Sequence, residues 1–332
     1  MSTKEDSLVA EFNSERVNYA TGVMLNADDF IAEQNYHRGR LARALGYLHG
    51  YGTVAGLRVL HEPSSDISVV ELSVVNSGAP EAKNFKGMLG EPLGSIPLGG
   101  KVSIAKRDSH DTTDVELEER ITVQPGLAID RHGRLIEVSK PFCLRLNRWF
   151  LSQETEKLEN ARHEGTTNAV VADLFVRFVT CEHGKTPAFA SGPFNSLDAI
   201  TAARLRDYFE FFMVLRPKTL PLPMPVSPWE SIADVPSEDR KAALNEAVLS
   251  SWRGGTEFND ENGLLPLVEH TGVSDTSSLL LARIQIPAIR GEGTGTGADT
   301  PRPVRTEDPV TIDNNLRHFV YGAGALAQWM DR

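Results

Sequence analysis

The stretch that decides the fold is HGYGTVAGLRV, residues 49–59. Gly50, Gly52 and Gly56 have the spacing G-x-G-x-x-x-G, which is that of a relaxed dinucleotide-binding loop. Such a loop follows a strand and precedes a helix, whose N-terminal amides hold the pyrophosphate. Here the order is reversed, and the glycines stand at the carboxyl end of a helix, where the dipole is negative. The order of elements therefore favours a helix-to-strand joint over a phosphate site.

The segment before the joint predicts a long helix over residues 27–49. Asn26 is a good N-cap, because its side-chain oxygen can accept a hydrogen bond from an amide of the first turn. Asp28 and Asp29 place negative charge at the positive end of the helix dipole. Gly50 ends the helix in a left-handed conformation. The spacing predicts one core-facing stripe made of Phe30, Gln34, His37, Leu41, Leu45 and Leu48.

The joint itself predicts a turn that leads into a strand over residues 53–60. We expect a positive φ angle at Gly50 or Gly52, where the chain leaves the helix. Gly56 indicates a bulge or a close backbone approach inside the strand. Gly133, in the sequence DRHG, is expected in the turn between two paired strands. The side chains expected to face the core are Val54 and either Leu57 or Leu60.

The rest of the chain is strand-rich, and its strands do not alternate regularly with helices. Residues 196–215 are expected to begin as a helix or turn and to become a strand at about 207–215. The pattern predicts an α+β fold with antiparallel, sandwich- or barrel-like β domains and a second helix at about 229–252. The predicted organisation is an arm (1–16), a helix plus β-rich domain (17–146) with a loop-rich insertion (62–114), a β-rich continuation (147–216), a Pro-rich connector (217–228), and a last part (229–332) with a helix, a strand, a C-terminal packing segment and a Gly-rich loop (291–303).

The composition restricts the classes of partner. The chain has 332 residues and a formal net charge of -11, and an acidic surface repels nucleic-acid phosphates. Arg38, Arg40 and Arg43 on the long helix are interpreted as a solvated face, and no nucleic-acid partner is expected. No apolar run reaches the ~18 residues of a membrane span, so none is expected. Cys143 and Cys181 are interpreted as reduced thiols, with a single bridge left open.

Several groups could carry chemistry, and each has a simpler structural interpretation. Asp28 and Asp29 could form a carboxylate pair, but their place in the first turn favours capping. The histidines at 37, 49 and 61 have no metal-ligand spacing, and residues 109–114 lack the glycine and glutamate of a calcium loop. Cys181 and His183 could supply two zinc ligands, but no second pair is in view. We therefore expect no catalytic, metal or cofactor-binding residues and no cofactor, and assign structural roles to Asn26, Gly50, Gly52, Gly56 and Gly133.

The first motif also resembles a pattern found in one family. The pattern runs from an aromatic residue and a glycine through Leu, D-F, E-Q-x-Y and an arginine-rich helix to L-H-G-x-G-V-V-x-G-L-x-V. The chain departs from it at Thr53, where valine is more typical. The matching residues are Tyr19, Gly22, Leu25, Asp29, Phe30, Glu33, Gln34, Tyr36, Leu48, His49, Gly50, Gly52, Val54, Gly56, Leu57 and Val59.

Later segments resemble the same family in the same order. They are VQPGLAIDRHGRLIEV, LFVRFVTCE, ARLRDYFEFFMVL, LLLARIQI and TIDNNLRHFV. The likeness covers most of the chain outside 62–114, 145–165, 217–276 and 291–305. The family is that of baseplate- or tail-associated structural proteins of contractile phage tails and phage-tail-like extracellular contractile injection systems.

The resemblance implies a non-enzymatic structural or adaptor subunit in the baseplate, which docks neighbouring subunits and could carry a fibre or spike. It implies a symmetric multi-copy assembly with other tail or baseplate subunits. The implied location is a virion or tail-like particle that is assembled in the bacterial cytoplasm. The alternative is a module, carried by such a particle, that binds or hydrolyses surface polysaccharide, for which Asp130, Glu182 and Glu210 are the obvious carboxylates.

Overall fold

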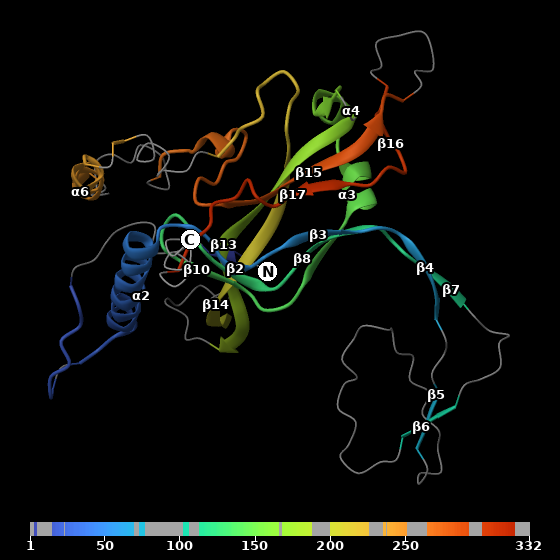
Figure 1. Cartoon of the computed structure of the whole chain (residues 1–332). Helices are drawn as coiled ribbons and strands as arrows, with labels where there is room; N and C mark the ends of the chain where they lie inside the picture. The colour runs from blue at the N-terminus through green and yellow to red at the C-terminus, as the bar shows by residue number, and fades with distance from the viewer. Residues whose placement is uncertain are drawn as a thin grey trace, which may run out of the picture. The chain divides into compact units, whose positions relative to one another are not determined.

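The computed structural model describes residues 3–4, 15–22, 24–69, 73–76, 102–105, 113–165, 168–187, 200–225, 235–236, 238–250, 264–291 and 301–322. The chain divides into two compact units (Figure 1). Unit 1 contains Met1–His61, Thr122–Cys143 and Ser152–Arg332, and unit 2 contains Glu62–Ile121 and Leu144–Leu151. The fold is α+β, strand-rich and antiparallel, as the sequence predicts.

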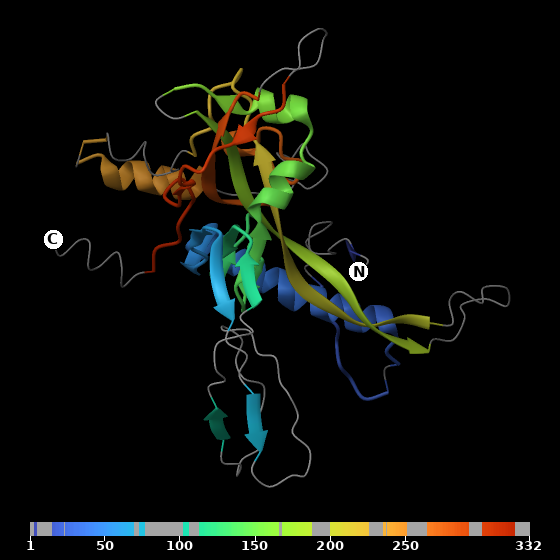
Figure 2. The same ribbon diagram turned by 90° about the vertical axis from the view of Figure 1, so that its right-hand side faces the viewer.

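The main sheet of unit 1 is built on a long pair of strands. β13 (Ala169–Pro187) pairs in antiparallel register with β14 (Ile200–Leu215) from Ala172↔Leu215 to Pro187↔Ile200. Figure 2 shows this pair as a twisted ribbon. β15 (Leu279–Ile289) also pairs with β13. Four short strands complete the seven-stranded sheet: β1 (Thr3–Lys4), β12 (Arg162–His163), β16 (Val304–Arg305) and β17 (Thr311–Asp313).

The first two strands after the long helix, β2 and β3, belong to two separate three-stranded sheets. The first has the order β10-β9-β2, with β2 at Gly52–Gly56, β9 at Gly126–Ile129 and β10 at Leu135–Val138. The second has the order β11-β8-β3, with β3 at Val59–Glu62, β8 at Arg120–Val123 and β11 at Phe142–Arg145. The pairing of β2 with β9 shifts register between Thr53 and Ala55, which is the irregularity expected near Gly56.

The core of unit 1 lies around β13 and β15. Ala169–Val176 are all buried, and so are Leu279–Arg283. Strands covered on both faces read as near-continuous apolar runs rather than as alternating patterns, which explains the sequences AVVADLFV and LLLAR. Phe175 is fully buried and stacks on Phe212, with ring centroids 5.5 Å apart. This core fixes the ends of the strands that carry the polar contacts described below.

Unit 2 contains all of the segment that the sequence marks as an insertion, residues 62–114. β4 (Ser65–Val69) pairs with β7 (Thr113–Leu117), and β5 (Ser73–Asn76) pairs with β6 (Val102–Ala105). The helix α3 (Leu146–Ser152) buries Leu146 and Phe150, and the amide of Leu146 donates to the carbonyl of Glu119. Two short strand pairs, one nested inside the other, thus lie in the region that the sequence marks as loop-rich.

The helices of unit 1 are α2 (Ala27–His49), α4 (Thr155–Asn160), α6 (Arg240–Ser250) and the 3-10 turn η2 (Val268–His270), among the described residues. The bounds of α2 agree with the predicted 27–49. The second predicted helix, 229–252, is observed only as α6, and residues 226–234 lie outside the described residues. The Gly-rich loop lies mostly outside them as well, as do most of the arm and residues 109–112.

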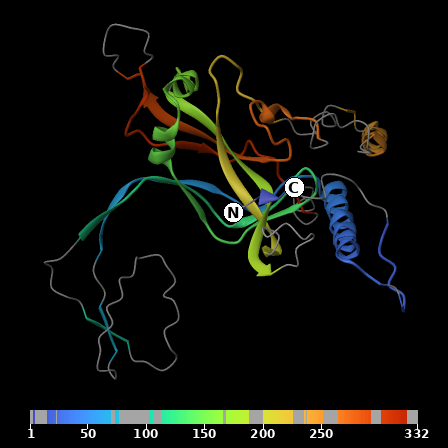
Figure 3. The same cartoon turned by 180° about the vertical axis from the view of Figure 1, so that it is seen from behind.

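Two sequence-based expectations about unit 1 are wrong. Residues 200–206 form part of β14, and not a helix or turn, because they pair with β13 over its whole outer half. The stripe predicted to face the core on α2 is largely exposed, with Phe30 52%, Leu41 61% and Leu48 77% exposed. The helix packs instead through Ala42, its one buried residue. Figure 3 shows α2 from behind.

Candidate functional site

The helix-to-strand joint, residues 50–59, has the geometry expected of a structural turn. Asn26 and Asp29 form a capping box at the start of α2, with hydrogen bonds of 3.0 and 2.8 Å. At its end, the amide of Gly50 donates to the carbonyl of Gly46. The positive φ angles expected at Gly50 or Gly52 are present at both, 75° and 134°. The expectation for Val54 is wrong, because its side chain is 37% exposed.

Two of the joint's glycines are required by the approach of other backbone. A Cβ atom on Gly52 would lie 2.5 Å from the carbonyl oxygen of His318. A Cβ atom on Gly56 would lie 2.1 Å from the carbonyl oxygen of Pro125. Gly133, in the turn between β9 and β10, has φ 84°, and its Cβ would meet the carbonyl of Ala42 on α2. Gly52 and Gly56 therefore let the backbones of His318 and Pro125 approach β2, and Gly133 lets the β9–β10 turn approach the backbone of α2.

Leu57 is the one non-glycine residue with a positive φ angle in the described chain, at 53°. Its side chain is fully buried. A left-handed conformation costs a residue with a Cβ atom about 1–2 kcal/mol, so the surrounding contacts must hold it. The strongest of these contacts come from the far end of the sequence.

A segment near the C-terminus, residues 314–320, closes on the joint, and we call it the C-terminal clamp. The Asn314 side chain accepts a hydrogen bond from the amide of Val59 at 2.9 Å and donates one to its carbonyl at 3.0 Å. The amide of Thr53 donates to the carbonyl of His318, and the amide of Val320 donates to the carbonyl of Thr53. The clamp therefore supplies the hydrogen bonds of a neighbouring strand to a chain that has just left a helix.

Arg317 is the buried centre of this clamp. Its Nη1 donates to the carbonyl of Leu57 at 2.7 Å, its Nε donates to the carbonyl of Asn314 at 3.0 Å, and its Nη2 donates to the side chain of Asn314. Burial, aided by the charge of Arg58, lowers the pKa of Arg317 to about 10. The guanidinium thus stays charged at neutral pH and is solvated by carbonyl oxygens. Neither Asn314 nor Arg317 carries a local sequence signal for this role.

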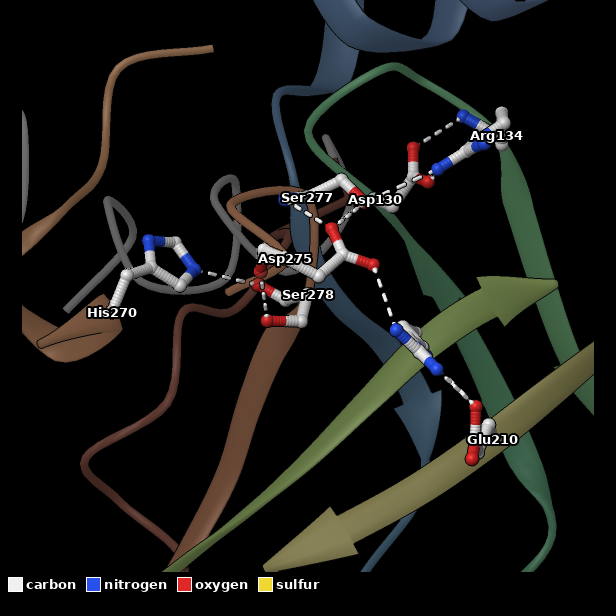
Figure 4. Close-up of polar contacts among 8 residues, drawn as sticks. Asp130, Arg134, Glu210, His270, Asp275, Ser277 and Ser278 are labelled. Atoms are coloured by element: carbon white, nitrogen blue, oxygen red, sulfur yellow. Dashed lines mark hydrogen bonds and ion pairs between the residues drawn. The ribbon is translucent and has the colours of Figure 1, made fainter. Parts of the chain in front are cut away.

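Asp130, the first carboxylate of the hydrolase alternative, is fully buried in a turn (Figure 4). One oxygen accepts from the amides of His132 and Arg134, and the other accepts from Nε of Arg134 at 2.6 Å. Burial raises the pKa of Asp130, and the arginine and the two amides oppose that rise. Every one of these contacts fixes the turn that carries Gly133.

The same network continues to Glu210, the second of those carboxylates. Arg134 donates to Oγ of Ser277, which donates to Asp275 at 2.7 Å. Asp275 lies 3.8 Å from Arg177, and Arg177 forms an ion pair of 2.6 Å with Glu210 (Figure 4). Glu182, the third carboxylate, is exposed on β13 opposite Leu205. Asp130 and Glu210 thus belong to one structural network, which does not include Glu182 in the described contacts.

A second buried network surrounds Asp173 of β13. Its carboxylate accepts from Nε of Arg216 at 2.7 Å and from Nε and Nη2 of Arg283 at 2.8 and 2.9 Å. Arg216 also donates to the carbonyls of Thr271 and Glu269, and Arg283 to that of Pro223 in the connector. These arginines hold the connector and η2 against the sheet. Asp173 was not among the sequence candidates, because a lone acid in an apolar run gives no spacing signal.

His270 of η2 and His318 of the clamp belong to the third polar group, which is largely buried. The amide of Leu267 donates to Nδ1 of His270, so Nε2 carries the proton and donates to the carbonyl of Ser278 at 2.9 Å. Burial lowers the pKa of His270, and Arg131 adds to the effect. The side chain of Glu269 contacts Nε2 of His318 in the clamp at 3.1 Å. Burial by itself raises the pKa of Glu269, but His318, the backbone amide of Glu269 and His270 together outweigh it and lower the pKa.

The remaining candidates are spread over the structure. Cys143 is exposed and Cys181 buried, and both are free thiols, which answers the open question of a bridge. His37 contacts Glu33 one turn away on α2, and Arg38 lies 3.8 Å from Asp207. Within the described residues, no group of three or more His, Cys, Asp or Glu side chains could hold a metal ion.

The described helices include none with the length and apolar character needed to cross a membrane. No protein-family model matches the chain, and no curated protein matches it closely enough to count as a relative.

Proposed function

We propose that this protein is a non-enzymatic structural and adaptor subunit of a contractile phage tail or a tail-like injection particle. Its place would be the baseplate, where it would dock neighbouring subunits in a symmetric multi-copy assembly and could carry a fibre or spike. Such a particle would be assembled in the bacterial cytoplasm.

The observation that carries the proposal is the meeting of two family-like segments. The first motif ends in the joint, and the closing motif TIDNNLRHFV contains the clamp that binds this joint. The residues that resemble the family thus serve packing between distant parts of one chain. This is the pattern expected when a resemblance reflects a shared scaffold and not a catalytic centre.

The contacts of the carboxylates that the alternative function would use also support this proposal. A retaining or inverting glycosidase needs two carboxyl groups that face one substrate, one of them free to act as an acid. Asp130 and Glu210 are instead bound to Arg134 and Arg177. No observation in the described chain favours a hydrolase, so we do not pursue that alternative.

The proposal is tested in the bacterium or phage that encodes the chain. We expect tail-tube, sheath and baseplate genes beside its gene, and an epitope-tagged copy that sediments with purified particles. Deletion of the gene should leave particles with incomplete baseplates in electron micrographs. Metabolic genes on both sides, or normal particles that never contain the tagged protein, would contradict the proposal.

A further inference from the structure

The C-terminal clamp has two halves that are held in different ways. Its inner half, residues 314–317, is bound to the joint by Asn314 and Arg317 through carbonyl, amide and guanidinium groups. The pKa of Arg317 is about 10, so none of these groups changes its charge between about pH 7.5 and about pH 4. We therefore expect the inner half to stay bound to the joint in mild acid.

The outer half of the clamp, residues 318–320, depends on a carboxylate. The carbonyl of His318 accepts from the amide of Thr53, and the amide of Val320 donates to the carbonyl of Thr53. Outside the joint, Nε2 of His318 donates to Oε1 of Glu269 at 3.1 Å. The residue that fixes the outer half on β2 is thus itself fixed by a side chain of η2.

Glu269 holds His318 best while its carboxylate is ionised. The side chain is 3% exposed, and a neutral carboxyl group attracts the imidazole less than a carboxylate does. The other nearby cation is Arg216, which donates to the carbonyl of Glu269 and has its own charge paired with Asp173. Burial raises the pKa of Glu269, but His318, the backbone amide and His270 together lower it. The contact is therefore lost only below about pH 4.5.

His270, the next residue of η2, is a second titrating group (Figure 4). Its Nδ1 accepts from the amide of Leu267, and its Nε2 donates to the carbonyl of Ser278. A proton on Nδ1 would break the first of these bonds, because an imidazolium donates at both nitrogens. Burial lowers the pKa of His270, and of the charges that face it Arg131 lowers it further while Asp275 and the carboxylate of η2 raise it. Protonation of His270 would therefore open η2 beside the residue that holds the clamp.

We propose that Glu269 and His270 form an acid-sensitive latch for the outer half of the clamp. At neutral pH the latch holds residues 318–320 on β2. When both groups are protonated, η2 opens, His318 loses its partner, and residues 318–320 leave Thr53, while residues 314–317 stay bound to the joint. This inference concerns the chain by itself and does not depend on the particle role proposed above.

Amide hydrogen exchange of the full chain, followed from about pH 7.5 to about pH 4, tests the latch. Protection factors, which correct for the intrinsic effect of pH on exchange, are compared for three amides in the same sample. Thr53 donates to His318, Val59 donates to Asn314, and Val171 lies in the main sheet. Below about pH 6.5 the protection factor of Thr53 should fall by up to about tenfold per pH unit for each proton that opening takes up, while those of Val59 and Val171 stay within about threefold.

Glutamine at both latch positions keeps the hydrogen bonds but cannot titrate. In Glu269→Gln/His270→Gln, the protection factor of Thr53 should match that of the wild type at neutral pH and should no longer fall in acid. His163→Gln is the matched control, because His163 bonds the carbonyl of Arg216 and lies outside the latch. This control should keep the pH dependence of the wild type.

Three results would overturn the proposal. One is a wild type in which Thr53 and Val59 lose protection together, because the two halves of the clamp would then open as one. The second is a Thr53 amide that stays fully protected down to about pH 4. The third is a double variant that keeps the pH dependence of the wild type, or a loss of that dependence in His163→Gln. If the double variant does not fold, the comparison of Thr53 with Val59 in the wild type decides by itself.

Discussion

Asp173 neutralises one charge, yet two buried guanidinium groups contact it. Its side chain and those of Arg216 and Arg283 are at most 4% exposed. The second positive charge is held by backbone carbonyls, which accept from the remaining N–H groups. Such a group is costly to desolvate, but removing one member is costlier still, because it leaves the others buried without compensation.

We therefore expect Asp173→Asn to destabilise the protein by about 3–5 kcal/mol. Glu210→Gln is the matched control, because the pair of Glu210 and Arg177 is partly exposed and should be worth under about 1 kcal/mol. Urea unfolding followed by circular dichroism measures both. Equal losses in the two variants would show that Asp173 does not hold this group together.

His270 makes stability depend on pH. Its pKa is lowered in the folded protein, so below its unfolded pKa of about 6.5 the unfolded chain binds a proton that the folded chain excludes. The free energy of unfolding should therefore fall as the pH is lowered from about 6.5, by up to about 1.4 kcal/mol per pH unit.

His270→Gln should flatten this slope, since glutamine can accept from Leu267 and donate to Ser278 without titrating. A second fall in the free energy of unfolding is expected below about pH 4.5, because protonation of Glu269 removes its contact with His318. Unfolding free energies measured across this pH range test both expectations. An unchanged slope in the variant would assign the first loss to other histidines.

At the scale of elements, Gly50 and Gly52 show two different reasons why a position requires glycine. Both have positive φ angles, but a Cβ on Gly50 meets nothing within 4 Å, while one on Gly52 meets the carbonyl of His318. Gly50→Ala should therefore cost about 1 kcal/mol. Gly52→Ala should cost at least about 2 kcal/mol more, because the clamp must move. Thermal unfolding compares them, and equal costs would rule out the close approach.

The bounds of α2 were predictable because its start and end depend on neighbouring residues, namely Asn26, Asp29 and Gly50. The buried face was not predictable. Spacing shows which residues are apolar, but not whether a helix docks through them or through small residues such as Ala42 and Gly46. The extent of β14 was missed for a related reason. Its first residues, ITAARLR, have mixed local preference, and pairing with β13 decides their conformation.

At the scale of the whole molecule, the clamp is the contact that no local pattern indicates. Most polar candidates were also interpreted from the sequence one residue at a time. The structure instead joins Asp130 and Glu210 in one network, whose residues come from four different strands and loops. Such networks depend on tertiary proximity, which one sequence does not show.

The clamp can be tested by removing its buried charge while keeping its length. Arg317→Met should cost about 3 kcal/mol, because the carbonyls of Leu57 and Asn314 lose their donors. The same substitution at the exposed Arg290 should change stability by less than about 0.5 kcal/mol. Amide exchange of Thr53 and Val59 should rise in the first variant alone. Protected amides in Arg317→Met would mean that the clamp closes without its arginine.

The contact between the clamp and the joint also determines how late in synthesis the joint can be completed. Val59 and Asn314 are 255 residues apart in the chain. At about 5–20 residues per second, a ribosome needs on the order of 13–50 s to reach Asn314 after it has made Val59. During that time α2 and β2 are outside the ribosome, while the segment that completes their joint does not yet exist. The nascent chain therefore carries Leu57 without these hydrogen bonds until residues 314–320 have left the ribosome.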